Sequence, residues 1–181
     1  MLDAASYSAT GSLRDDSPFE IRALKPDDRD DLLAALDRTS TQSLFRRFFS
    51  VRRHFSEQEI DRFINVDFVD HVALVATVKE NGRTVIVGGG RYIMVRPGEA
   101  EMAFAIIDPY QGHGIGSALF WHLIAIARSA GLRKLTADVL PENAAMLKLF
   151  KRNGFRLHRH QGAEVKVELE LDGASPPAAS Q

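Results

Sequence analysis

A glycine-rich turn near the middle of the chain has the residue types and spacing of a phosphate-binding site. Gln111, Gly114 and Gly116 form the pattern Q-x-x-G-x-G, with a further glycine at Gly112, and a strongly apolar segment follows. Small side chains let a ligand approach the backbone, and the first N–H groups of a helix have no partner inside that helix. The helix dipole adds partial positive charge there. Residues 108–130 therefore predict a turn that opens a helix and holds a pyrophosphate.

The spacing around these glycines excludes several commoner sites. A dinucleotide-binding fold requires G-x-G-x-x-G and an acidic residue about 20 positions later, and Ser117 stands where the third glycine belongs. A P-loop requires a lysine directly after its second glycine, and none follows here. Ser117 lies in G-I-G-S-A rather than in the G-x-S-x-G turn of serine hydrolases, so we interpret it as a residue of the helix start.

The ordered set of motifs resembles the GCN5-related N-acetyltransferases, in which Q/R-x-x-G-x-G/A follows the fourth strand and opens the central helix. The resemblance runs from about Phe19 to about Leu171, and it includes Asn143 at a helix start and the Gly154–Phe155 pair at that helix's end. It implies an α/β fold with a mixed, mostly antiparallel central sheet flanked by helices. Two strands of that sheet splay apart and hold the pantetheine arm of acetyl-CoA, the co-substrate that the resemblance implies.

The resemblance also implies which residues bind the cofactor. The pyrophosphate contacts the glycine turn, and the pantetheine arm pairs with strand backbone and lies beside the asparagine. The corresponding residues here are Ile106, Ile107, Gln111, Gly112, His113, Gly114, Ile115, Gly116, Ser117 and Asn143. Two of them have simpler explanations, because Asn143 is a good helix cap and a loop histidine such as His113 is often exposed.

A narrower resemblance concerns the segment SLFRRFFSVRRH, residues 43–54. Together with Asp67-Phe68 and the run HVALVA at residues 71–76, it is similar to the acetyltransferase domain of bacterial protein lysine acetyltransferases that modify AMP-forming acyl-CoA synthetases. It implies an acceptor protein with a reactive lysine. The basic segment is also explained as a solvated helix face over a buried phenylalanine stripe, or as a basic lip for acidic groups. A small amine stays open as the acceptor.

Glu101 is the candidate general base. A lysine amine has an ordinary pKa of about 10.4, so a group that accepts its proton is needed at neutral pH. Strand alternation puts Glu101 on one face with Ala103 and Ala105, which leave room beside the carboxylate. In the protein lysine acetyltransferases that the chain resembles, a glutamate at this spacing from the motif glutamine is the base, and Glu101 and Gln111 keep it. The alternative is a charged residue near a strand end.

The proton donor of the family has no counterpart here. Many members carry a tyrosine on the last helix that protonates the departing thiolate, and the matching position is Phe150, which cannot donate a proton. The thiolate then leaves unaided or takes a proton from water. Phe150 also motivates a different hypothesis, a CoA-binding regulatory module without turnover.

Local patterns predict the elements that position these residues. Residues 1–18 and 172–181 have no apolar period and predict a flexible arm and tail around one domain, residues 19–171. Gly88-Gly89-Gly90 predicts a bulge or close backbone approach within a strand. The predicted order begins with a strand at 19–24 and continues with helices after Pro26, after Ser40 or Thr41, and after Ser56. Strands at 72–78, 84–95 and 100–107 follow, and then the helix after the glycine turn. The last elements are a parallel strand at 135–140, a helix from Asn143 to Gly154 and a final hairpin at 155–158 and 165–171.

Composition limits the function. The net charge of −1 argues against general nucleic-acid binding, and the lack of cysteine excludes disulfides, thiolate metal sites and a cysteine nucleophile. His158 and His160 have no carboxylate or cysteine at ligand spacing, so we expect no metal. No apolar run is long enough to cross a bilayer, and the first residues lack the features of a signal peptide, so we expect a cytoplasmic protein.

Overall fold

A computed structural model describes residues 2–49, 54–159 and 164–171. These residues form one eight-stranded sheet in the order β1-β2-β3-β4-β5-β6-β8-β7. All neighbouring strands are antiparallel except β5 and β6, which are parallel. The strands are β1 (Ser8–Ser12), β2 (Pro18–Ala23), β3 (His71–Glu80), β4 (Arg83–Arg96), β5 (Glu99–Ile106), β6 (Lys134–Val139), β7 (Arg156–Arg159) and β8 (Val165–Glu170).

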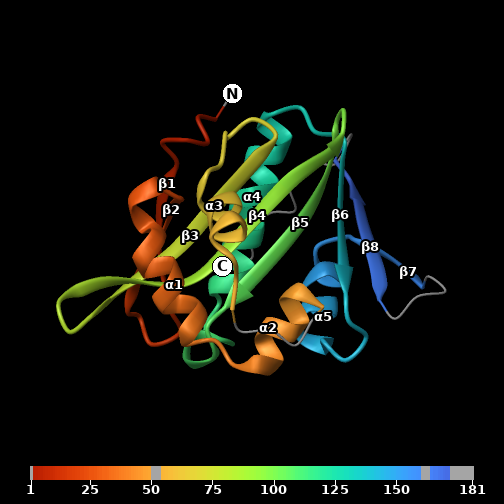
Figure 1. The fold of residues 1–181 in the computed structure, drawn as a ribbon. Coiled ribbons are helices and arrows are strands. Elements are labelled where there is room, and N and C mark those ends of the chain that lie inside the picture. The colour runs from red at the N-terminus through yellow and green to blue at the C-terminus, as the bar shows by residue number, and fades with distance from the viewer. Residues whose placement is uncertain (1, 50–53, 160–163, 172–181) are drawn as a thin grey trace.

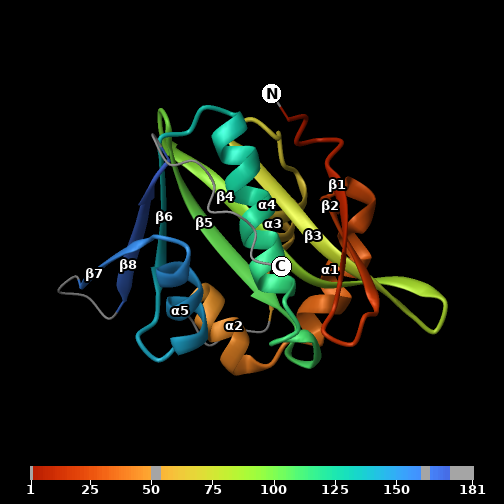
Figure 2. The same cartoon turned by 180° about the vertical axis from the view of Figure 1, so that it is seen from behind.

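Helices cover both faces of this sheet. The helices α1, α2 and α3 lie on the face seen in Figure 1, and α4 and α5 lie on the opposite face, seen in Figure 2. Their bounds are α1 (Arg29–Asp37), α2 (Thr41–Phe48), α3 (Glu57–Ile64), α4 (Ile115–Ser129) and α5 (Ala144–Arg152), with 3-10 turns η1 (Pro26–Asp28) and η2 (Asp108–Tyr110). The predicted mixed, mostly antiparallel α/β fold is confirmed.

The predicted helix starts are confirmed by their capping bonds. The Ser40 hydroxyl accepts a hydrogen bond from the Ser43 N–H at the start of α2. At α3, Ser56 and Glu59 form a reciprocal capping box, in which each side chain accepts from the other residue's backbone N–H. Such caps satisfy helix N–H groups that have no partner within the helix. The local signals at Ser40 and Ser56 therefore fix where the helices over the sheet begin.

The glycines of β4 allow two large side chains of β5 to lie across it. A Cβ added at Gly88 would stand 2.4 Å from Cδ1 of Ile106, and one at Gly90 would stand 2.7 Å from Cδ1 of Phe104. The register between β3 and β4 also shifts beside Gly88, at Ala76. Both parts of the prediction for the triple glycine, a bulge and a close approach, are confirmed.

The strands β5 and β6 separate after a short paired stretch. They pair at Glu99, Ala100 and Glu101, and the residues of β5 beyond Glu101 have no partner on β6. The helix α4 joins the two strands and packs on the sheet through a buried face of Leu119, Phe120, Leu123, Ile124, Ile126 and Ala127. The predicted splay of these two strands is therefore confirmed, and it opens a gap in the middle of the sheet.

The N-terminal prediction is wrong in part. Residues 8–12 form the edge strand β1, which pairs with β2, and Ala4 and Leu13 are buried beside it. A Cβ added at Gly11 would stand 2.5 Å from Cζ of Phe19, so this strand passes directly under the ring. Backbone pairing at a sheet edge needs no apolar alternation, which is why the pattern did not reveal it. The predicted tail, residues 172–181, lies outside the described residues.

Candidate active site

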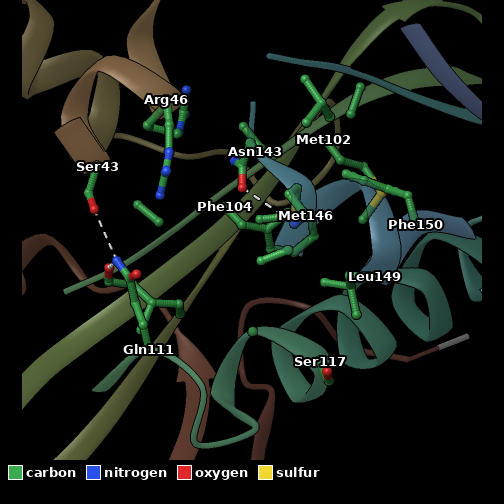
Figure 3. Close-up of a pocket in the computed structure, with 18 of the residues that line it drawn as sticks. Ser43, Arg46, Met102, Phe104, Gln111, Ser117, Asn143, Met146, Leu149 and Phe150 are labelled. Atoms are coloured by element: carbon green, nitrogen blue, oxygen red, sulfur yellow. Dashed lines mark hydrogen bonds between the residues drawn. The ribbon is translucent and has the colours of Figure 1, made fainter. Parts of the chain in front are cut away.

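The gap between β5 and β6 contains a cavity of about 340 Å³. Its lining comes from both faces of the sheet, because Glu101 and Ala103 face the α2 side while Met102 and Phe104 face the α4 side. Figure 3 shows Arg46 and Ser43 on one side of this cavity and Phe150, Leu149 and Met146 on another. The cavity therefore connects the two faces of the sheet.

The glycine turn forms one end of this cavity. Gln111, Gly112, Gly114, Gly116 and Ser117 all line it. Gly112 and Gly114 have φ angles of 77° and 96°, which side chains with a Cβ rarely adopt. Gly114 is also the N-cap of α4, and no side chain caps that helix. The first N–H groups of α4 are therefore open to an anionic group at the cavity's end.

The free edge of β5 runs along the gap. The Ile107 N–H donates to the Val87 carbonyl of β4 at 3.0 Å, so strand alternation turns the backbone groups of Phe104 and Ile106 away from β4. The Ile106 carbonyl already accepts a hydrogen bond from the Gln111 side chain at 3.0 Å. The groups that face the gap thus belong to Phe104 and Ile106.

Three predicted cofactor residues do not line the cavity. Ile107 is 2% exposed, and its carbonyl accepts from the Tyr110 N–H, so both of its backbone groups are engaged within the chain. Ile115 is 1% exposed and packs its side chain into the core, which leaves its N–H as its contribution. The His113 ring lies beside Tyr110, a lining residue, with 6.4 Å between ring centroids, but His113 itself is not part of the lining.

Asn143 has both of its predicted roles available. Its Oδ1 accepts a hydrogen bond of 3.3 Å from the Met146 N–H, so it caps α5, and its side chain also lines the cavity (Figure 3). Phe150 lines the cavity from the same helix and is 1% exposed. Its ring packs against Phe155 and Phe120, with centroids 4.7 and 5.4 Å away. Phe150 therefore closes the α5 side with an apolar surface.

A hydrogen-bond network joins α2 to the glycine turn. The Asp108 carboxylate accepts from the Ser40 N–H at 2.8 Å, from the Ser40 hydroxyl at 2.7 Å and from the Ser43 hydroxyl at 3.1 Å. The Gln111 side chain donates to the Ser43 hydroxyl at 3.0 Å. Partial burial raises the pKa of Asp108, but these hydrogen bonds outweigh it and hold that pKa below its ordinary value. The network holds α2 against one wall of the cavity.

The basic residues of α2 line the same wall. Burial lowers the pKa of the Arg47 guanidinium to about 10, and the negative charge of Glu101 opposes that shift. The guanidinium lies 4.7 Å from the centroid of the Phe48 ring. Arg46 has a buried Nε without a hydrogen-bond partner in the part of the chain that the structure describes. Arg46 and Arg47 therefore line the cavity, which fits the alternative interpretation of the segment as a basic lip, and Arg52 and Arg53 lie outside the described residues.

Sequence patterns missed three polar residues of this cavity. Arg14 reaches it from the turn between β1 and β2, within the segment predicted to be a flexible arm. Ser43 and Asp138 also line it, from α2 and from β6. Arg14 and Asp138 belong to no recognisable motif, and Ser43 opens the SLFRRFFSVRRH segment without having been assigned a role. The place of all three depends on how the strands and α2 pack together. Among residues 2–49, 54–159 and 164–171, no cluster of metal-ligating side chains occurs, and no helix is long and apolar enough to cross a membrane.

Comparisons with known proteins agree with this geometry. A model of the acetyltransferase (GNAT) family matches residues 38–155. The chain is 34% identical over 157 residues to the acetyltransferase Pat of Mycolicibacterium smegmatis, an alignment that covers 84% of this chain and 46% of that protein. It is 33% identical over 145 residues to an acetyltransferase of Pseudomonas aeruginosa, with 80% of this chain and 78% of the relative covered.

A solved structure is also similar over nearly the whole fold. The GNAT domain of S. lividans PAT has a TM-score of 0.82 and 33% identity, and the match covers 90% of this chain and 96% of that one. The chain spans about half the length of the Mycolicibacterium protein. The two proteins named Pat support the narrower resemblance of the sequence. With a family match over most of the chain, a splayed sheet and an uncapped glycine turn, this protein belongs to the acetyltransferase (GNAT) family.

Proposed function

We propose that this protein uses acetyl-CoA to acetylate a lysine side chain of an acceptor protein, with Glu101 as the general base. The observation that carries the proposal is the placement of Glu101 in the cavity that also reaches the glycine turn. A carboxylate on one face of the sheet thus shares a continuous space with an anion-binding helix start on the other. That arrangement suits a cofactor that enters from one face and an amine that enters from the opposite face.

The described residues fit acetyl-CoA in three ways. The uncapped N–H groups of Ile115, Gly116 and Ser117 would hold the pyrophosphate, with Arg46 supplying positive charge. The gap-facing backbone groups of Phe104 and the Ile106 N–H would pair with the pantetheine amides, in place of the predicted pairing at Ile107. Gln111, Gly112 and Gly114 would surround the pyrophosphate, and Asn143 would lie beside the pantetheine arm.

Glu101 would perform the proton transfer. Its side chain is exposed to the cavity, where it accepts the proton of the amine directly or through a water molecule. The neutral nitrogen then forms a bond to the acetyl carbon, the bond from that carbon to sulfur breaks, and the second proton that the nitrogen loses passes to water. A positioned general base typically contributes about 10²-fold to 10⁴-fold to such a rate.

No acidic side chain is required at the Phe150 position. A thiol has an ordinary pKa of about 8.5, so its thiolate leaves more readily than an alkoxide or an amide. Phe150 cannot donate a proton, and its apolar ring closes the cavity against water from the α5 side. We propose that the thiolate leaves unaided or takes its proton from water.

The acceptor is proposed from the narrower resemblance. The chain is similar to proteins named Pat, and residues 43–48 of its SLFRRFFSVRRH segment lie in α2 at the cavity wall. An AMP-forming acyl-CoA synthetase is therefore the acceptor protein to test first. A small amine would need a more enclosed acceptor side than the exposed Glu101 provides.

The test measures release of CoA thiol from acetyl-CoA by the purified protein. One reaction offers an AMP-forming acyl-CoA synthetase, and a second offers a mixed panel of small amines. The proposal predicts turnover with the synthetase and addition of one acetyl mass at a lysine. Turnover with amines alone would contradict the proposal of a lysine acceptor. Acetyl-CoA binding without transfer in either reaction would contradict both the lysine acceptor and the small-amine acceptor.

A further inference from the structure

A second carboxylate lines the cavity on the side of Glu101. In the parallel register, Glu101 pairs with Thr136, and Asp138 lies two residues further along β6. Side chains two residues apart on a strand share a face, so Asp138 is on the same face as Glu101. The burial pattern agrees, since Ala137 and Val139 are each 3% exposed while Asp138 is exposed.

Asp138 stands where β6 has already separated from β5. Pairing between the two strands ends at Glu101 and Thr136, so Asp138 faces the gap from the wall opposite Ala103. The small side chains of Ala103 and Ala105 leave space between the two walls. The carboxylates of Glu101 and Asp138 are thus presented to one space from two different strands.

No interaction within the described residues occupies the Asp138 carboxylate. Its cross-strand neighbour on β8 is Lys166, yet the two form no ion pair. By contrast, Glu168, which pairs with Thr136 on this face of β6 and β8, forms ion pairs with Lys134 at 2.7 Å and with His158 at 2.9 Å. The charge of Asp138 is therefore available to a ligand, in the part of the chain that the structure describes.

The positive charges on the α2 wall of the cavity also favour binding of a cationic amine at the β6 wall, beside Asp138. Arg46 and Arg47 line the cavity from α2, and their positive charges repel a cationic amine. An ammonium group carries three N–H donors and no acceptor, and it forms its strongest hydrogen bonds with carboxylates. A cationic amine is thus drawn toward the β6 wall and away from α2.

We propose that Asp138 binds the ammonium group of the acceptor and presents it to Glu101. One N–H of the ammonium donates to Asp138, and the proton that is removed goes to Glu101. Asp138 then selects a protonated aliphatic amine, such as a lysine side chain, over neutral nucleophiles. The inference rests on the proposed function and adds a residue that recognises the acceptor.

The test compares Asp138→Asn with wild type on the acceptor that turns over. Asn keeps the size of the side chain and removes its charge, so we expect the KM for the acceptor to rise roughly tenfold or more. We expect kcat and the KM for acetyl-CoA to change by less than about twofold, because Asp138 does not take the proton. Asp138→Glu should recover part of the acceptor affinity.

A matched control removes a nearby carboxylate that does not line the cavity. Glu142 is exposed just after β6 and does not line the cavity. Glu142→Gln should therefore leave kcat, the KM for the acceptor and the KM for acetyl-CoA at their wild-type values. Thermal melting of each variant separates a folding defect from a binding defect. An unchanged acceptor KM in Asp138→Asn would overturn the inference while leaving the proposed function intact.

A binding measurement decides the inference even if no acceptor turns over, the result that would contradict the proposed function. The n-butylammonium ion is titrated against wild type and Asp138→Asn, and backbone amide shifts are followed by NMR, with n-butanol as the neutral probe. We expect the ammonium to shift amides of residues 101–103 and 136–139 in wild type, and the variant to lose these shifts. Equal shifts in both proteins, or none in wild type, would overturn the role of Asp138.

Discussion

The side-chain amide of Gln111 donates a hydrogen bond of 3.0 Å to the hydroxyl of Ser43, which lies 68 residues earlier in the chain. The same amide donates to the Ile106 carbonyl at the end of β5. Gln111 thus connects α2, β5 and the glycine turn at the place where the cavity begins. The motif glutamine therefore fixes α2 and the end of β5 against the glycine turn that lines the cavity.

Asp108 is the residue through which this connection is most easily tested. In Asp108→Ala, Ser40 and Ser43 lose three hydrogen bonds to the carboxylate. These groups are exposed, so we expect a loss of about 1 kcal/mol in the free energy of unfolding, measured by urea denaturation. We also expect weaker acetyl-CoA binding by isothermal titration, because α2 and the turn lose their link.

The control for Asp108 is Asp3→Ala. Asp3 accepts hydrogen bonds from the Ala5 N–H and the Ser6 hydroxyl within its own turn and does not line the cavity, so its loss should leave acetyl-CoA affinity unchanged. An Asp108→Ala protein with wild-type affinity for acetyl-CoA would show that the network does not position the cofactor site.

The glycines of β4 offer a test of packing with a built-in control. A Cβ at Gly90 would meet Phe104 at 2.7 Å and Leu123 at 2.9 Å, so Gly90→Ala should lower the free energy of unfolding by about 1–3 kcal/mol. A Cβ at Gly89 meets its nearest atom, the Leu74 carbonyl oxygen, at 3.4 Å, so Gly89→Ala should cost much less. Equal losses for the two variants in denaturation experiments would contradict this account of the close approach.

The fold and part of the site could be predicted because their signals are local. The caps at Ser40 and Ser56 and the glycine turn each depend on a few adjacent residues, and the structure has each where it was expected. Asp138 and Arg14 could not be found in this way. Their place in the cavity depends on strand register and on the packing of the N-terminal segment, which no short pattern encodes.

The sequence also could not predict which backbone groups of β5 face the gap. Alternation along β5 was predicted correctly, yet Ile107 was expected to pair with the cofactor. Its N–H is used by Val87 of β4, and this depends on which residues of an antiparallel pair exchange hydrogen bonds. That phase is set by the register shift between Met94 and Arg96 and by the turn before β5, so it could not be predicted from residue types.

His71 makes the stability of the fold depend on pH. Burial, and then the positive charge of Arg91, lower its pKa to about 4, while Asp67 opposes the shift. Neutral His71 accepts a hydrogen bond from the Arg91 guanidinium at 3.1 Å, and protonation would end it. The unfolded chain binds this proton below its ordinary pKa of about 6.5, so stability is complete above that pH and falls as the pH drops toward 4.

The measurement is urea denaturation at a series of pH values for wild type and His71→Gln. Since His71 is partly exposed, we expect it to account for roughly 1–2 kcal/mol of the loss between neutral pH and pH about 4, after solvent screening. His71→Gln should show a flatter pH dependence across this range. Parallel curves for the two proteins would contradict the assignment.

The central claim is that Glu101 takes the proton of the acceptor amine, and Glu101→Gln tests it most directly. The single measurement is the rate of acetyl transfer by wild type and Glu101→Gln at saturating acetyl-CoA, with acetyl-CoA affinity determined on the same samples. We predict that kcat falls by about 10²-fold to 10⁴-fold while acetyl-CoA affinity stays at its wild-type value. A variant that binds acetyl-CoA normally and transfers as fast as wild type would contradict the account.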